Sequence, residues 1–226
     1  MKIAFSWSGG KDSTMALHEL ITKNSAVSTL LTTITGDYDR ISIHGVRRSL
    51  LIEQAESIGL PLEEVLIYKE STDEDYGTKM KAKLSSLKIN GISTVAYGDI
   101  FLESLREKRI SLATSVGIDC IFPIWKRDTT ELANTFIKLG YKAIITCIDS
   151  HVLGKEFVGR EFDSYLLSDL PEKVDPCGEN GEFHTFVYNG PIFKKKIRLS
   201  KGEVVLRENR FYYCDLIPDS IGEQAR

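Results

Sequence analysis

Apolar and amphipathic segments alternate along the first half of the chain. Short apolar runs that are typical of buried strands lie at 3–7, 27–34, 63–68, 92–97 and 118–122. Helix-like stretches lie between them, near 12–23, 44–58, 72–89 and 103–117. Strands that alternate with helices form right-handed βαβ units, and their strands pair in parallel. We therefore expect an α/β fold with a five-stranded parallel sheet and helices on both faces.

The pattern changes near Phe122. A helix is predicted at 128–139, a strand at 141–148 and a further helix at 159–168. Strand-like segments follow at 183–188, 192–199, 203–207 and 211–217, with Asn-Gly turn signals before and among them. We expect two domains, residues 1–122 and a smaller α+β domain at 123–226. The polar tail from residue 219 is expected to fray.

The first strand runs into the string Ser6-Trp7-Ser8-Gly9-Gly10-Lys11-Asp12-Ser13, and a helix follows. Glycines allow a tight turn and a close approach of the backbone to a ligand. The first turn of a helix has unpaired N–H groups, and its dipole favours an anion. Lys11 adds a cation, and the serines add hydroxyl groups. The string therefore predicts a nucleotide phosphate site, although a tight turn with a solvated lysine is the alternative.

Two further places carry candidate groups. Gly98-Asp99 follows the 92–97 strand, and ligands of parallel sheets bind at the carboxyl ends of strands. Asp99 either directs a carboxylate toward Mg²⁺ or substrate, or forms a turn or a helix cap. His44, Arg47 and Arg48 open the second helix-like stretch, where cations oppose the helix dipole. They are candidates for binding phosphate, or a chance cluster.

A second motif extends from Asp175 to Phe186 and is rich in glycines and carboxylates. Glu179 and Glu182 are candidates for holding a metal or a substrate amine, and His184 for carrying a proton near neutral pH. A hairpin turn at Asn180-Gly181 is the alternative, and both interpretations can hold together. A nucleophilic role for Cys177 stays open as an alternative, although the sequence shows no base beside it.

Composition narrows the setting of the protein. The 226-residue chain has a net charge of −3, which argues against a nonspecific nucleic-acid binder. Its four cysteines form no Cys-x-x-Cys pair and no zinc spacing. No signal sequence is evident, and no apolar run nears the length of a membrane helix. We expect a cytoplasmic protein with reduced thiols and no membrane partner.

The string Ser-Gly-Gly-Lys-Asp-Ser resembles the PP-loop of the N-type ATP pyrophosphatases, which split ATP into AMP and pyrophosphate. Gly98-Asp99-Ile100, Pro123-Ile124-Trp125, Leu153-Gly154 with Gly159-Arg160, and Gly178–Phe186 follow in the order found in the diphthine–ammonia ligase-like branch. The resemblance covers nearly the whole chain. It implies a Rossmann-like fold of the adenine nucleotide alpha-hydrolase-like type.

The resemblance also implies a ligase reaction. In this branch ATP adenylates the carboxylate of a modified histidine on translation elongation factor 2, and ammonia displaces AMP. The implied cofactors are ATP and Mg²⁺. The implied catalytic residues are Lys11, Asp12 and Asp99, with Asp12 also as metal ligand. The implied nucleotide-binding residues are Ser8, Gly9, Gly10, Lys11, Asp12, Ser13 and Gly98. We expect the substrate-binding residues to be the basic residues His44 and Arg48 together with the motif residues Trp125, Glu179, Asn180, Gly181, Glu182 and His184.

The second motif departs from the usual ligase string Glu-Gly-Gly-Glu-x-Glu-Thr. Asn180 stands for a glycine and His184 for a glutamate, as in a sister branch. The acceptor is therefore either a small carboxylate or the modified-histidine protein. The alternatives are a PP-loop ATPase that adenylates another small molecule or tRNA, and a nucleotide-sensing module without catalysis. The sequence leaves the ammonia source and a homodimer open.

Overall fold

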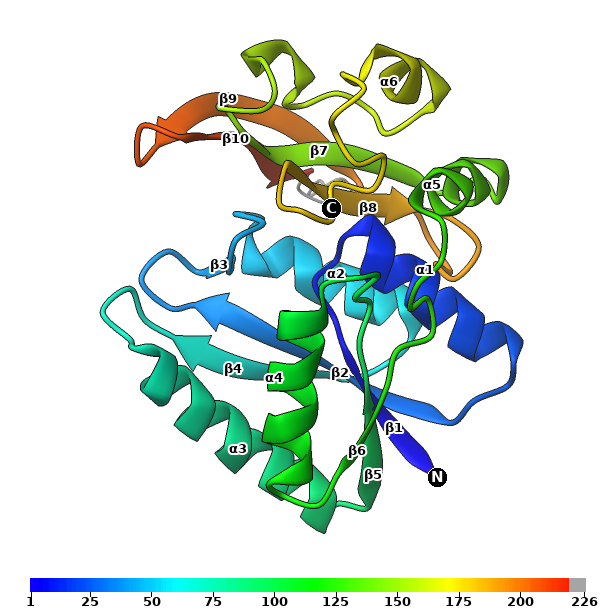
Figure 1. Ribbon diagram of the computed structural model, residues 1–226, viewed down its shortest axis with the longest axis vertical. Coiled ribbons are helices and arrows are strands. Elements are labelled where there is room, and N and C mark those ends of the chain that lie inside the picture. The colour runs from blue at the N-terminus through cyan, green and yellow to red at the C-terminus, as the bar shows by residue number, and fades with distance from the viewer. Residues whose placement is uncertain (220–226) are drawn as a thin grey trace, which may run out of the picture.

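The computed structural model describes residues 1–219. Most of the tail that we expected to fray, residues 220–226, lies outside the described residues. Two sheets make up the architecture, and a layer of helices lies between them (Figure 1).

The first sheet, sheet A, has six strands. Five pair in parallel in the order β4-β2-β1-β5-β6, and the short β3 pairs antiparallel with the end of β2. The bounds are β1 (Lys2–Ser6), β2 (Val27–Thr35), β3 (Arg40–Ile41), β4 (Leu62–Ile67), β5 (Ile92–Ala96) and β6 (Asp119–Ile121). The predicted α/β fold with five parallel strands is confirmed, and β3 is an addition that the hydrophobic pattern did not indicate.

Helices cover both faces of sheet A. They are α1 (Lys11–Thr22), α2 (Arg48–Ile58), α3 (Asp73–Ile89) and α4 (Glu103–Thr114). Successive side chains of a strand point to opposite faces. Ile3 and Phe5 of β1 accordingly pack in the core with α1 and α2, whereas Ala4 packs with α3 and α4. Figure 1 shows α3 and α4 on the outer face and α1 and α2 on the face toward the second sheet.

The second sheet, sheet B, is antiparallel in the order β8-β7-β10-β9. Its strands are β7 (Lys142–Asp149), β8 (Phe183–Asn189), β9 (Leu199–Arg207) and β10 (Phe211–Pro218). The accompanying helices are α5 (Thr129–Lys138), the short 3₁₀ helix η1 (Lys155–Phe157) and α6 (Ser164–Asp169). One core cluster includes side chains of α1, α2 and sheet B. Sheet B therefore packs on the α1–α2 layer, where it can reach the loop that begins α1.

Three local predictions need correction. The helix expected at 44–58 begins at Arg48, because the preceding turn contains Ile43 and Gly45 with positive φ angles of 69° and 68°. The strand expected at 192–199 is wrong, since the chain turns there and β9, which includes the predicted 203–207 strand, starts at Leu199. The helix expected at 159–168 is the shorter α6. Among residues 1–219, no helix is long and apolar enough to cross a membrane.

Candidate active site

The glycine loop, Ser8–Ser13, joins β1 to α1 at the carboxyl end of β1. Gly9 adopts a φ of 76°, a region that disfavours residues with a Cβ. A Cβ on Gly9 would lie 2.7 Å from Gln54 Oε1. A Cβ on Gly10 would lie 2.9 Å from His44 Cε1 and 3.1 Å from the Thr185 carbonyl oxygen. Both glycines are therefore required by close packing from α2, the β3–α2 turn and β8.

The first turn of α1 has free hydrogen-bond donors. The N–H groups of Asp12 and Ser13 donate to no acceptor within residues 1–219. A Cβ on Gly98 would lie 2.9 Å from Ser13 N, so the backbone of Gly98 approaches this turn closely. Unpaired N–H groups at a helix start, together with the helix dipole, favour an anion. The geometry fits the nucleotide-binding role predicted for the loop and for Gly98.

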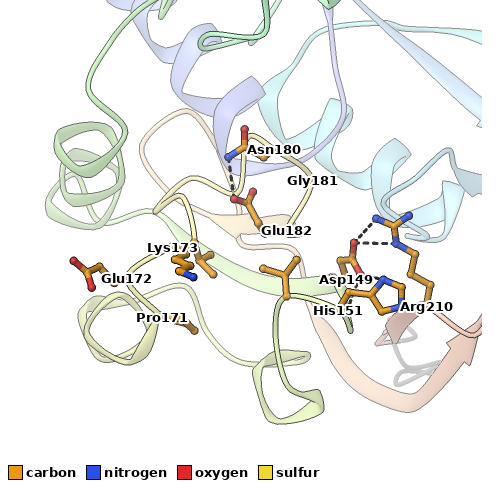
Figure 2. Close-up of a pocket in the computed structure, with 11 residues that line it drawn as sticks. Asp149, His151, Pro171, Glu172, Lys173, Asn180, Gly181, Glu182 and Arg210 are labelled. Atoms are coloured by element: carbon orange, nitrogen blue, oxygen red, sulfur yellow. Dashed lines mark hydrogen bonds and ion pairs between the residues drawn. The ribbon is translucent and has the colours of Figure 1, made fainter.

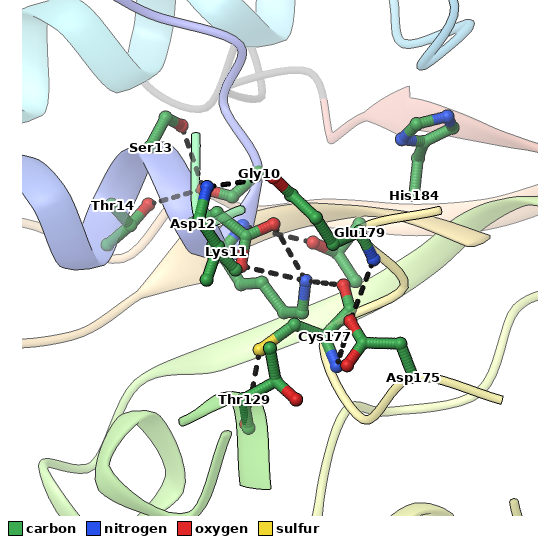
Figure 3. Close-up of polar contacts among 12 residues, drawn as sticks. Gly10, Lys11, Asp12, Ser13, Thr14, Thr129, Asp175, Cys177, Glu179 and His184 are labelled. Atoms are coloured by element: carbon green, nitrogen blue, oxygen red, sulfur yellow. Dashed lines mark hydrogen bonds and ion pairs between the residues drawn. The ribbon is translucent and has the colours of Figure 1, made fainter. Parts of the chain in front are cut away.

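Lys11 is buried, with an exposed fraction of 3%. Its Nζ donates to both carboxylate oxygens of Asp12, at 2.8 and 3.0 Å, and to the Cys177 carbonyl (Figure 3). It also lies over the rings of Phe162 and Phe183, 5.7 and 5.3 Å from their centroids. Burial is the largest single influence and lowers the pKa of Lys11, but the charge and hydrogen bond of Asp12, together with the electrostatic contributions of Cys177 and Glu179, outweigh it, so that the pKa is raised. The alternative of a solvated turn lysine is therefore wrong.

Asp12 is the carboxylate partner of that amine. Burial raises its pKa, although the Lys11 charge opposes the shift. Its side chain keeps an exposed fraction of 26%. Residues 1–219 contain no group of three or more His, Cys, Asp or Glu side chains arranged to hold a metal ion. Asp12 therefore offers one carboxylate next to the free amides and no complete protein cage for a cation.

The loop 175–182 lies against Lys11 and carries Glu179. The Asp175 carboxylate accepts from the N–H groups of Cys177 at 3.2 Å and Glu179 at 2.9 Å, which fixes the turn. Glu179 Oε1 accepts from Ile100 N at 2.8 Å and Phe101 N at 3.3 Å. Burial raises the pKa of Glu179 to about 7. Glu179 thus ties the loop 175–182 to the segment that follows β5, through a carboxyl group that titrates near neutrality.

Glu182, by contrast, faces a separate cavity of about 730 Å³. Its Oε1 accepts from Asp175 N at 3.1 Å and Asn180 Nδ2 at 3.0 Å, and its buried Oε2 has no partner within the described part of the chain. Gly181 also lines this cavity, and the Asp149–Arg210 ion pair lies on its other side (Figure 2). The structure therefore divides the predicted substrate residues of the second motif between two environments.

His44 and His184 form a ring pair beside the glycine loop. Their centroids are 4.6 Å apart, and His44 Nδ1 lies 3.2 Å from the Thr185 carbonyl oxygen. Burial lowers the pKa of His44 to about 4 and lowers that of His184 well below its ordinary value. Both rings are therefore neutral at physiological pH, which favours hydrogen bonding over charge pairing.

Strand β8 contacts the glycine loop through Thr185 and Val187. Lys11 N donates to Thr185 Oγ1 at 3.0 Å, and Val187 N donates to the Gly9 carbonyl at 2.9 Å. Residues two apart in a strand point to the same face, and Phe183 and Thr185 both contact Lys11. Sequence reasoning did not assign Thr185 a role in the site. Its position two residues from Phe183 was the available signal.

Three predicted site residues have other partners. The Arg48 guanidinium binds Glu64 at 2.5 and 2.8 Å. The Asp99 carboxylate pairs with Arg109 Nε at 2.7 Å. The recorded ring contacts of Trp125 are with Phe122 and Arg106. Within residues 1–219, none of these three side chains forms a hydrogen bond or ion pair with Lys11 or Asp12. Asp99 is also not the cap of α4, since Leu102 is the residue that precedes that helix. Their predicted roles stay predictions.

Cys177 contributes its backbone carbonyl to the site, and its thiol is not reactive. Its carbonyl accepts from Lys11, while Sγ donates to the Thr129 carbonyl at 3.3 Å (Figure 3). Burial raises the pKa of the thiol, which leaves the thiol protonated and a poor nucleophile. We expect Cys177→Ser to keep the pyrophosphate release that the glycine-loop resemblance predicts within about threefold of wild type. A pyrophosphate-release assay checks this expectation. A loss of activity as large as that caused by removing a catalytic nucleophile would contradict it.

Comparisons with known proteins give a consistent result over the chain. A family model described as the diphthamide synthase N-terminal domain matches residues 1–120, and one described as the diphthamide synthase C-terminal domain matches residues 128–216. A Danio rerio protein named diphthine–ammonia ligase is 27% identical and covers 92% of this chain and 90% of its own length. The Mus musculus protein of that name is also 27% identical, covering 91% of this chain and 85% of its own. For the Schizosaccharomyces pombe protein of that name the identity is 25%, and the match spans only 37% of that longer protein.

Proposed function

Because the chain belongs to the diphthamide synthase family, we propose that it is an ATP-dependent ligase that adenylates a carboxylate, amidates it with ammonia and releases AMP and pyrophosphate. The observation that supports this most directly is the buried Lys11–Asp12 pair at the start of α1, next to the free N–H groups of Asp12 and Ser13. The relatives named above are ligases by name. The four free cysteines fit a reducing compartment such as the cytoplasm.

The glycine loop would act on the phosphates of ATP. When the substrate carboxylate attacks the α-phosphate, negative charge collects on the departing pyrophosphate. The Lys11 amine and the Asp12 and Ser13 amides are fixed before the reaction, so they would stabilise that charge without reorganising. The two glycines allow the phosphate chain to approach the backbone.

Mg²⁺ fits the residues present as a partner of the nucleotide. This ion usually binds through one or two carboxylates together with substrate phosphates and water. Asp12 is the carboxylate that we propose for it. When bound, the ion would supply charge neutralisation on the phosphates.

Glu179 is the group that we propose for the ammonia step. The nitrogen attacks the acyl carbon of the acyl-adenylate, the bond from that carbon to the AMP oxygen breaks, and AMP leaves with the electron pair. The nitrogen must also give up a proton. A carboxyl group with a pKa of about 7 can accept it at neutral pH.

The acceptor is proposed to be a carboxylate other than diphthine. Diphthine carries a quaternary ammonium group, which a carboxylate attracts. His184, where the ligase branch has glutamate, is held neutral by burial and beside His44. A neutral imidazole removes that attraction and adds a hydrogen-bonding group. One such change can redirect specificity, because specificity is a difference between affinities.

Product analysis tests the proposed reaction. With ATP, Mg²⁺, ammonium and a panel of carboxylates, we expect AMP and pyrophosphate in equal amounts and an amide product. ADP release, or tight ATP binding without turnover, would contradict the ligase assignment. The second outcome would identify a nucleotide sensor.

The acceptor needs its own assay. Diphthine-bearing elongation factor 2 is offered with ATP and ammonium to wild type and to His184→Ala. We expect slow or no amidation by both proteins. Efficient amidation that His184→Ala leaves undiminished would show that diphthine is the acceptor.

A further inference from the structure

Gln54 of α2 lies against the glycine loop, although it was not a candidate from the sequence. Its side chain is fully buried, with an exposed fraction of 0%. Its Nε2 donates to the Gly9 carbonyl at 3.1 Å and to the Val187 carbonyl at 2.5 Å. Its Oε1 accepts from Trp7 Nε1 at 3.0 Å. One side chain thus joins the end of β1, the glycine loop and β8.

These contacts determine where the Gly9 carbonyl points. That oxygen accepts from Gln54 Nε2 at 3.1 Å and from Val187 N at 2.9 Å. The C=O and N–H groups of a planar trans peptide point in opposite directions. With the Gly9 carbonyl held toward α2 and β8, the Gly10 N–H points the other way, where its recorded partner is Ser8 Oγ at 3.3 Å. The carbonyl is also unavailable to Ser13 N–H.

A reversed Gly9–Gly10 peptide would harm phosphate binding. It would direct a carbonyl oxygen, which carries partial negative charge, toward the anion. Glycine tolerates such a change because it populates both signs of φ. The site therefore needs a partner that selects one peptide orientation, and a buried amide with two N–H donors on two carbonyls meets that need.

We propose that Gln54 is a positioning residue that fixes the orientation of the Gly9–Gly10 peptide and so keeps the N–H groups of the glycine loop directed at the nucleotide phosphates. The proposal rests on the ATP site proposed above. It adds that the loop depends on β8 and α2 for its binding geometry. Removal of the Gln54 donors weakens nucleotide affinity without unfolding the protein.

The test uses binding of an ATP analogue with a methylene bridge between the α- and β-phosphates, which cannot release pyrophosphate. In Gln54→Glu the shape is kept, but the ionised side chain has no donors. We expect its Kd for the analogue to rise on the order of tenfold or more at pH 8, equivalent to about 1.4 kcal/mol. Partial recovery is expected at lower pH, where a protonated glutamate regains one donor. Gln54→Met, with a side chain of similar length, should lose affinity at every pH.

Ser57→Ala is the matched control on the same helix. It removes a side-chain hydrogen bond to the Lys195 carbonyl, 2.6 Å long, and leaves both donations from Gln54 Nε2 in place. We therefore expect a lower Tm with a Kd within about threefold of wild type. Folded Gln54 variants that bind as tightly as wild type, or a Ser57→Ala variant that loses affinity equally, would overturn the proposal.

Wild type provides a measurement that does not depend on a folded variant. The NMR signal of the Gly10 amide proton should shift on addition of the analogue, and an unmoved signal in a protein that binds would also overturn the orientation assigned here. A wild-type protein that binds no analogue at all would instead contradict the proposed function.

Discussion

Lys11→Ala is expected to lower pyrophosphate release on the order of 100-fold or more, because it removes a prepositioned cation from the phosphate site. A charge-assisted hydrogen bond typically contributes about 1.5–3 kcal/mol. Asp12→Ala is expected to have a comparable effect, since it removes the carboxylate that holds the Lys11 amine at 2.8 Å. The measurement is initial-rate pyrophosphate release at saturating and limiting ATP.

Two further variants separate charge from packing. Lys11→Met fills the space under Phe162 and Phe183 without a charge, so it should be as inactive as Lys11→Ala and more stable. Lys23→Ala removes an exposed lysine next to the same helix, whose salt bridge to Glu19 is a surface pair at 3.3 Å. It should behave as wild type. Near-normal turnover by folded Lys11→Met would refute the role of the charge.

Glu179→Gln is expected to slow amide formation on the order of 100-fold, which is the usual lower range for loss of a general base. In the wild type the rate should rise as pH increases through about 7, the pKa to which burial raises Glu179, because the ionised carboxylate accepts the proton. The variant should lose this limb of the profile. Total ammonium is adjusted at each pH so that free ammonia stays constant. A variant with an unchanged profile would assign the proton to another group.

The Glu179 carboxyl group also makes the stability of the fold depend on pH, and stability should fall over the range in which the reaction rate rises. Its pKa is about 7 in the folded protein against 4.5 unperturbed, so the folded state binds the proton more tightly. Stability therefore falls as pH rises from about 4.5 to about 7, because the unfolded state releases the proton first. Glu179→Gln keeps an acceptor for Ile100 N and avoids this cost. Relative to wild type, its Tm should increase between pH 4.5 and 8, by roughly 2–4 °C for each kcal/mol recovered. A difference independent of pH would contradict the assigned pKa.

Two predicted site residues, Arg48 and Asp99, form ion pairs that the local sequence pattern did not indicate. Arg48 was a phosphate candidate because cations at a helix start oppose the dipole. Its charge is instead neutralised by Glu64, sixteen residues away and on β4. Asp99 pairs with Arg109 from the next helix, at 2.7 Å. Charge patterns record which groups are present and not which partner each group finds.

The sequence by itself determined the alternation of strands and helices in sheet A, because the burial of one face imposes periods of 2 and 3.6 that neighbouring residues reveal. It also determined the glycine loop, since only glycine suits the φ of 76° and the close packing there. The tertiary structure alone decided that Lys11 is buried by Cys177 and Phe183 from a distant segment. It alone decided that Gln54 and β8 turn the Gly9 carbonyl away from the phosphate site. These contacts join residues that are 45 to 178 positions apart in the sequence. They form because side chains of sheet B pack on the α1–α2 layer. Such packing between distant segments is not encoded by a local hydrophobic period.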